Sequence, residues 1–114
     1  MLESARMSES ARSYAIVLTT AGSEEQATTV ARELVERRLA ACVNIVGQVC
    51  SVYRWKGEVR QEEEWLLLIK TAVDRFPEVR AAIRSLHSYE TPEVVMLPLA
   101  DADPDYLTWL AGEV

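Results

Sequence analysis

The chain is poor in the residues that most often bind metals or form disulfides. It has one histidine, His87, and two cysteines, Cys42 and Cys50, among 114 residues. If both cysteines lie in one extended strand, eight residues at about 3.3 Å each put them roughly 26 Å apart. A disulfide needs Cα atoms within about 7 Å, and the C-x-x-C spacing of a zinc or thioredoxin site is absent. We therefore predict two unbridged cysteines, buried as small residues in a strand.

Positive charge and long apolar runs are also scarce. The 12 Lys and Arg residues face 18 Asp and Glu residues, for a formal net charge of −6. The basic stripe of a nucleic-acid-binding protein is missing, and no apolar run approaches the ~20 residues that cross a bilayer. The opening "MLESARMSESARS" lacks the apolar stretch of a signal peptide. We expect no nucleic-acid partner, no membrane partner and a cytoplasmic location.

What is present indicates one folded unit. Hydrophobic residues make up 49% of the chain, which is ordinary for a globular protein, and the length is that of one domain. We expect a flexible leader over residues 1–12 and a single domain over residues 13–114, without an internal linker or repeat.

The first half reads as a strand, a helix and a long hairpin. Residues 13–21, "SYAIVLTTA", are β-branched and apolar, as in a buried strand. Ser23 and Gln26 form a capping box, and the helix that follows ends near Arg38. Residues 39–55 and 58–71 are predicted strands joined by a turn at "RWKGE", with a bend or bulge at Gly47. The outer half of the returning strand is charged, "EEE" over 62–64 marking a solvated arm, and its inner half is apolar.

The second half of the chain is predicted to form a helix, a strand and a short final helix. A helix is expected over residues 74–87 and a strand over 91–100, whose Pro98 belongs at a sheet edge. Asp103 as N-cap and Pro104 at the first helical position open a short final helix. The order β-α-β-β-α-β predicts an α+β, ferredoxin-like sandwich with a long β-hairpin and a C-terminal helix. Because the two central strands are apolar on both faces, self-association is expected to cover the face without helices.

Several blocks together resemble the CutA family of divalent-cation-tolerance proteins. "LAACVNIV", "SVYRWKGEV", "HSYETPE" and "YLTWL" fall in the family's order and spacing from about Tyr14 to Leu110. The resemblance implies a homotrimer whose hairpin arms pair between subunits, and a role in tolerance of divalent metals, chiefly copper, by binding rather than catalysis. The architecture also resembles the PII signalling proteins, which hold small ligands between subunits. A PII-like small-molecule sensor is therefore the alternative function.

A metal site is expected at the end of the second helix. Imidazole binds copper well, and His87 has Glu90 and Glu93 nearby as oxygen ligands. Family members with a proposed copper site carry a cysteine near the end of the first strand and a second histidine, where this chain has Thr19 and Leu86. We expect copper, or another divalent cation, to bind in the micromolar range or more weakly. We place His87 at a surface turn. Alternatively, it binds no metal, and its charge or a hydrogen bond only suits the C-terminal end of the helix.

A second set of residues belongs to the family blocks and is placed near the cleft between subunits: Trp55, Glu64, Lys70 and Tyr89. Trp55 and Tyr89 could equally be interface packing, since large aromatics dominate such contacts. Lys70 could bind an anion or pair with a glutamate. The sequence lacks a G-x-S-x-G elbow and a P-loop, so we expect no enzymatic activity.

Overall fold

The computed structural model describes residues 12–114. The elements, in chain order, are β1 (Tyr14–Ala21), α2 (Glu24–Glu36), β2 (Cys42–Trp55), β3 (Glu58–Ala72), a 3-10 turn (Val73–Arg75), α3 (Phe76–Leu86), β4 (Val95–Pro98) and α4 (Pro104–Glu113). Of the predicted leader, residues 1–11 lie outside the described part. Arg12, its last residue, contacts the fold.

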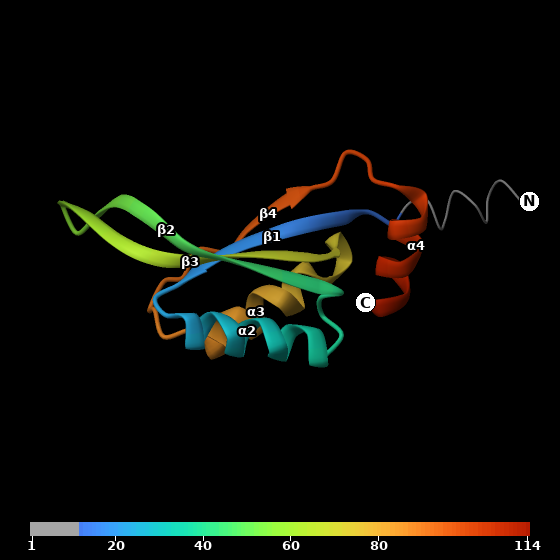
Figure 1. Cartoon of the computed structure of the whole chain (residues 1–114), viewed down its shortest axis with the longest axis horizontal. Coiled ribbons are helices and arrows are strands. Elements are labelled where there is room, and N and C mark those ends of the chain that lie inside the picture. The colour runs from blue at the N-terminus through green and yellow to red at the C-terminus, as the bar shows by residue number, and fades with distance from the viewer. Residues whose placement is uncertain (1–11) are drawn as a thin grey trace, which may run out of the picture.

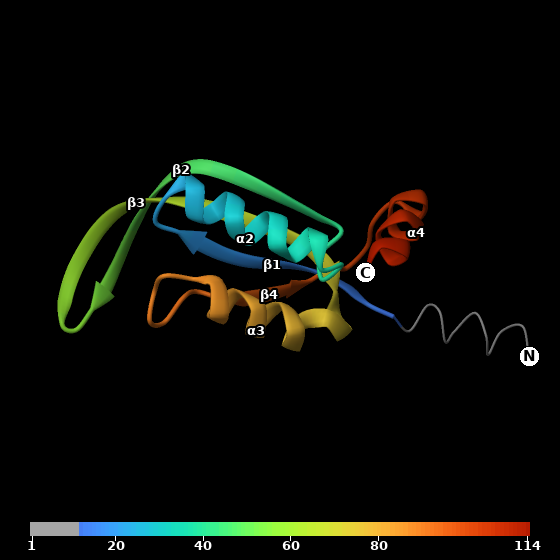
Figure 2. The same ribbon diagram turned by 90° about the horizontal axis from the view of Figure 1, so that it is seen from below.

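The four strands form one antiparallel sheet in the order β2-β3-β1-β4. Helices α2 and α3 both cover the same face of it (Figures 1 and 2). This is the ferredoxin-like α+β arrangement, so the predicted fold class is confirmed. The core lies between helices and sheet, and its largest fully buried side chains include Val17, Val30, Leu34, Leu67, Ile69, Val79 and Ile83.

Several predicted boundaries were wrong by a few residues, each for a local reason. Helix α2 ends at Glu36, and β2 begins only at Cys42, because Arg38 takes a left-handed backbone conformation (φ 58°). The N–H groups of Leu39 and Ala40 then both donate to the carbonyl of Leu34. This closes the end of the helix in the manner of a C-terminal capping turn.

The second helix and the last strand are also shorter than predicted. Helix α3 begins at Phe76, after the 3-10 turn, with Pro77 in its first turn, where a missing N–H costs nothing. Strand β4 is only Val95–Pro98, because residues 91–94 belong to the loop after α3 and residues 99 and 100 lie beyond the end of the strand. Its position at the edge, predicted from Pro98, is confirmed.

The hairpin of β2 and β3 projects beyond the helices as an arm (Figures 1 and 2). Its turn holds Lys56 (φ 50°) and Gly57 (φ 81°), the two left-handed residues of a tight hairpin. The register of β2 on β3 shifts between Gly47 and Val49, which confirms the predicted bulge. Both cysteines are unbridged as predicted, but their predicted burial was wrong: Cys42 is half-buried and Cys50 exposed. Cys42 lies on the sheet face that no helix covers, and Cys50 lies in the projecting arm.

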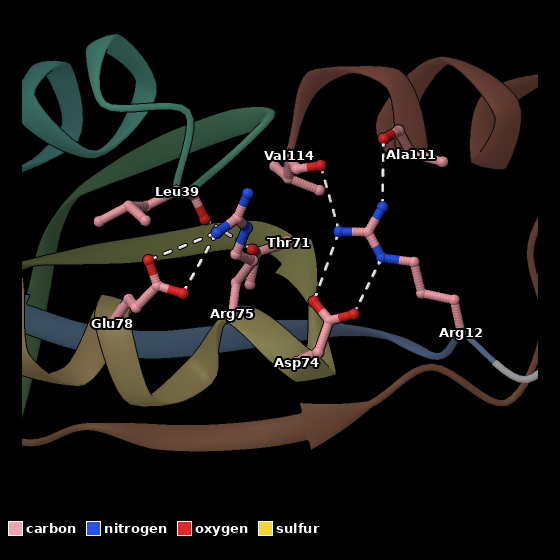
Figure 3. Close-up of polar contacts among 8 residues, drawn as sticks. All are labelled: Arg12, Leu39, Thr71, Asp74, Arg75, Glu78, Ala111 and Val114. Carbon is pink, nitrogen blue, oxygen red and sulfur yellow. Dashed lines mark hydrogen bonds and ion pairs between the residues drawn. The ribbon is translucent and has the colours of Figure 1, made fainter.

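Helix α4 lies at the opposite end of the molecule from the arm (Figure 1). Asp103 caps it as predicted, accepting hydrogen bonds from the N–H groups of Asp105 and Tyr106. At its other end Arg12 donates to the carbonyls of Ala111 and Val114 and pairs with Asp74, as Figure 3 shows. The helix is thereby tied to the start of β1 and to the turn after β3.

The sheet face away from the helices is largely apolar, although Asn44 and Lys70 also lie on it. Side chains alternate between the faces of a strand, so the half-buried partners of the core residues lie on this open face. They are Ile16, Leu18, Val46, Leu66, Leu68, Val95 and Leu97. Within one chain Val46, Val95 and Leu97 remain 42%, 43% and 47% exposed. Among the described helices, none is long and apolar enough to cross a membrane.

Candidate functional site: the groove beside the hairpin arm

An open groove of about 680 Å³ lies between the hairpin arm and the segment that follows α3. Five residues that the sequence singled out line it together, namely Trp55, Glu64, Tyr89, Glu90 and Glu93. The other lining residues are Thr20, Ser51, Val52, Tyr53, Arg60, Glu62 and Thr91. Residues far apart in the sequence therefore meet here, where the arm faces the loop between α3 and β4.

Glu64 and Tyr89 form the inner end of the groove. Glu64 is only 6% exposed, unlike the solvated arm residue that "EEE" predicted, because the loop packs over it. The Tyr89 hydroxyl donates a hydrogen bond of 2.8 Å to Glu64 Oε2. Gly22 permits this position, since a Cβ there would lie 2.9 Å from the Tyr89 oxygen. Burial, and then the bond to Glu64, raise the pKa of Tyr89 above its usual value.

A second tyrosine–carboxylate pair lies further out along the arm. Tyr53 donates to Glu62 Oε1 at 2.7 Å, and this hydrogen bond is the main reason that the pKa of Tyr53 is raised. Both phenols therefore stay protonated at neutral pH and act as donors to their carboxylates. Arg60, two residues nearer the hairpin turn, is the one basic residue among those described that line the groove.

His87 is buried beneath the loop and does not line the groove. Its Nε2 lies 2.6 Å from the carbonyl oxygen of Thr20, so Nε2 carries the proton and donates. Its Nδ1 accepts the N–H of Tyr89 at 3.0 Å, and the two rings lie 4.5 Å apart between centroids. The expectation of a surface turn was wrong, because only 9% of His87 is exposed. Both ring nitrogens are already engaged.

The predicted metal ligands are not brought together. Glu90 and Glu93 line the groove, whereas His87 points to Thr20 and Tyr89. In residues 12–114 there is no group of three or more His, Cys, Asp or Glu side chains placed to share an ion. Thr19, where some relatives carry a cysteine, is 1% exposed, and its hydroxyl has no hydrogen-bond partner in this part of the chain. These residues do not fit a preformed copper site.

Lys70 lies away from the other predicted cleft residues. It pairs across the sheet with Ile16 and Cys42, and its ammonium donates to Asn44. It lies six positions from Glu64 along β3, about 20 Å of strand.

Seven lining residues were not predicted from the sequence, and three of them, Tyr53, Arg60 and Glu62, belong to the groove face of the arm. Alternation along the hairpin could have found them, because they share the face of β2 and β3 that carries Trp55 and Glu64. The signal that could have identified them is therefore the alternation of side chains, with a period of two, along the strands of the arm.

The fold and the groove define a ferredoxin-like protein with an extended hairpin, and known proteins of this class match it. The family model for the CutA1 divalent ion tolerance protein matches residues 15–113. The divalent-cation tolerance protein CutA of Thermus thermophilus is 52% identical over 95 residues, which cover 83% of this chain and 92% of that protein. The chain belongs to the CutA1 family.

Solved structures agree with this assignment. The divalent cation tolerance protein (Cut A1) from Thermus thermophilus has a TM-score of 0.87 and 48% identity, covering 89% of this chain and 98% of that one. The periplasmic divalent cation tolerance protein CutA of Archaeoglobus fulgidus has a TM-score of 0.86 and 33% identity, over 88% of this chain and 97% of that one. Human Protein CutA is 40% identical over 98 residues, and the match spans 86% of this chain but 55% of the human protein.

Proposed function

We propose that the chain acts as a homotrimeric binding protein in the response to divalent metal ions, without catalysing a reaction. Membership of a family named for divalent ion tolerance supports the cellular role. The observation that carries binding as the mechanism is the groove of about 680 Å³ beside Glu64 and Tyr89. Its size lies in the range of small-molecule sites.

The open sheet face supports self-association. It carries Leu68, Val95 and Leu97 with no covering element in residues 12–114, and β2 and β4 both have an unpaired edge in the described chain. Covering this face and one side of the arm would bury more than the ~800 Å² per partner of a standard interface. Three subunits are proposed because the family resemblance implies that number.

Copper is proposed to bind weakly, in the micromolar range or poorer. A copper(II) ion that used His87 would have to break the bond to Thr20 or the bond from Tyr89. Glu90 and Glu93 supply only carboxylate oxygens on the groove, and copper(I) prefers sulfur ligands. A role in metal tolerance therefore need not depend on tight copper binding by this chain.

The alternative function, a PII-like sensor of a small molecule, is favoured by a specific observation. Trp55, Tyr53 and Tyr89 line the groove together with carboxylates, a mixture of apolar walls and a few directed polar groups that is typical of ligand sites. Lys70 lies outside the groove, so a role for it in binding an anion there is not supported.

Light scattering and calorimetry test the proposal together. We expect a mass three times the 12.8 kDa subunit at micromolar concentration, and weak heats with copper(II) and zinc. Nucleotides and small anions are titrated in parallel to examine the sensor function. A stable monomer would refute the oligomer, and turnover of a phosphate or acyl ester would refute the absence of catalysis.

The proposed partners are other copies of the chain and a small ligand or metal ion, with no nucleic acid and no membrane. The cytoplasm is the proposed compartment, supported by the two free thiols of Cys42 and Cys50, since cytosolic proteins seldom form disulfides. The Archaeoglobus fulgidus relative is described as periplasmic. Cell fractionation followed by immunoblotting decides between the two compartments.

A further inference from the structure

The groove beside the arm carries a charge that its own residues do not neutralise. Glu62, Glu64, Glu90 and Glu93 line it, against the positive charge of Arg60 among the described residues. Glu64 is nearly buried, with 6% of its surface exposed, and it has no ion-pair partner in residues 12–114. A buried carboxylate without a cation is costly. The site therefore favours a ligand that brings positive charge.

The hydrogen-bonding groups that face the groove point to the same chemistry. Tyr89 and Tyr53 each donate their hydroxyl proton, to Glu64 Oε2 and Glu62 Oε1. What remains toward a ligand is phenol oxygen and the second oxygen of each carboxylate, all of them acceptors. At these two pairs an anionic ligand would meet carboxylates whose hydrogen-bond donors are already used, whereas an ammonium group supplies three donors of its own. The N–H donors of Arg60 and Trp55 lie further out, toward the hairpin turn.

Two acceptor sites lie along the groove, one at the Glu64–Tyr89 pair and one at the Glu62–Tyr53 pair. Glu62 and Glu64 are two positions apart on β3, so both lie on the same face of the strand. Their Cα atoms are about 7 Å apart at the usual rise of an antiparallel strand. Each acceptor site consists of one carboxylate that accepts a hydrogen bond from a tyrosine hydroxyl. A ligand with two ammonium groups on a short flexible chain matches this spacing.

Aromatic side chains also line the groove, with Tyr89 at its inner end and Tyr53 and then Trp55 further out along the arm. Trp55 and Tyr53 are each 37% exposed, and the ring of Tyr89 closes the inner end. Trp55 already holds a cation of the chain itself: the Lys56 ammonium lies 5.8 Å from its ring centroid, within the range of cation–π attraction. Aromatic faces of this kind also pack against the methylene groups of an aliphatic amine.

We infer that the groove binds an aliphatic diamine or polyamine, one ammonium beside the Glu64–Tyr89 pair and the next beside the Glu62–Tyr53 pair. This inference rests on the proposed binding function and names the ligand class of that same groove. Arg60 sets the outer limit of the cationic site, because its guanidinium repels a further ammonium. Glu90 and Glu93 add negative charge from the opposite wall.

Isothermal titration calorimetry of the full chain in its native assembly tests the inference. The probes are putrescine, with two ammonium groups, and butylamine, with one ammonium on the same four-carbon chain. Putrescine is expected to bind saturably and at least tenfold more tightly than butylamine. Glu62→Gln and Glu64→Gln should each weaken putrescine at least tenfold, while the matched exposed variant Glu25→Gln on α2 should leave it unchanged. Glu62 is exposed, so its variant reports on binding even if Glu64→Gln folds poorly.

Three results would overturn the inference. The first is the absence of saturable putrescine binding, as expected if a second copy of the chain fills the groove with its own basic side chain. The second is equal affinity for butylamine, and the third an equal loss in Glu25→Gln. A trimer that binds nucleotides or anions but not putrescine would leave the proposed function standing. A monomer that binds putrescine would support the inference and refute the proposed oligomer.

Discussion

Tyr89 donates its hydroxyl hydrogen bond to Glu64 across 2.8 Å, although the two residues are 25 positions apart in the chain. The bond joins the loop after α3 to the base of the hairpin arm. The same loop is fixed from below by His87, which contacts Thr20 and the N–H of Tyr89. The groove therefore has an inner end built by β1, β3 and this loop together.

A double-mutant cycle should show how strongly the two residues are coupled. Glu64→Gln and Tyr89→Phe each remove the charged hydrogen bond. In the double variant the same bond is lost only once, so the destabilisation should be smaller than the sum of the two single effects. Because bonds to charged groups contribute about 1.5–3 kcal/mol, we expect a coupling energy of roughly 1–3 kcal/mol in urea unfolding. Additive single effects would mean that the pair is not formed in solution.

Stability should fall at high pH through Tyr89. Its pKa in the folded protein is raised above the usual value, so the protonated form is favoured by folding. The contribution is complete below about pH 10, the ordinary pKa of tyrosine, and is lost as the pH rises through the folded-state pKa. Urea unfolding at increasing alkaline pH should show a smaller loss in Tyr89→Phe than in the wild type. Tyr106→Phe, an exposed residue of α4, is the control and should behave as the wild type.

Replacing His87 should destabilise the protein. His87→Ala deletes a buried ring and its bonds to Thr20 and Tyr89, which should cost about 1–3 kcal/mol. The neighbouring Ser88→Ala, at an exposed position, should cost much less. In the wild type, copper(II) should bind no more tightly than micromolar by calorimetry, since the imidazole must first give up a bond. Nanomolar copper affinity would show that the ring is free to act as a ligand.

Local sequence patterns predicted the helices and strands well. The burial of individual side chains depends on tertiary contacts, which those patterns do not contain. The N-cap at Ser23, the bulge at Gly47 and the cap at Asp103 are signals carried by a few adjacent residues, and all three are confirmed. The other half of the predicted capping box is not formed, because the Gln26 side chain bonds the backbone of Leu86 and Ser88. The burial of Glu64 was missed because "EEE" reads as a solvated run. Only the packing of Tyr89 against Gly22 and β3 removes Glu64 from water.

The same limit applies to the candidate sites. His87, Glu90 and Glu93 are close in sequence, yet the loop turns the imidazole inward and leaves the carboxylates outside. Lys70 shares a strand with Glu64 but lies six residues away, beyond the reach of the groove. Trp55, Glu64 and Tyr89 line one groove because the arm and the loop after α3 face each other, and no spacing in the sequence encodes that arrangement.

A charge on the open sheet face should disrupt the oligomer. Leu97 lies on β4 opposite Ile16 and is 47% exposed in the single chain. Leu97→Glu would bury a carboxylate in each subunit contact, at a cost of several kcal/mol, and light scattering should then report smaller species. Thr29→Glu, on the exposed side of α2, adds the same charge and should leave the mass unchanged. An unchanged mass in Leu97→Glu would exclude this face from the interface.

Arg12 should hold the last helix in place. Its guanidinium bonds the carbonyls of Ala111 and Val114 at 3.2 and 3.1 Å and pairs with Asp74 (Figure 3). A cation at a helix C-terminus satisfies carbonyls that have no partner within the helix and opposes the helix dipole. Arg12→Ala should therefore destabilise α4 by about 1–2 kcal/mol, seen as faster amide hydrogen exchange in Pro104–Glu113. Arg80→Ala on the exposed side of α3 removes the same charge and should leave that exchange unchanged. Equal exchange of α4 in the two variants would mean that the contacts of Arg12 do not stabilise the helix.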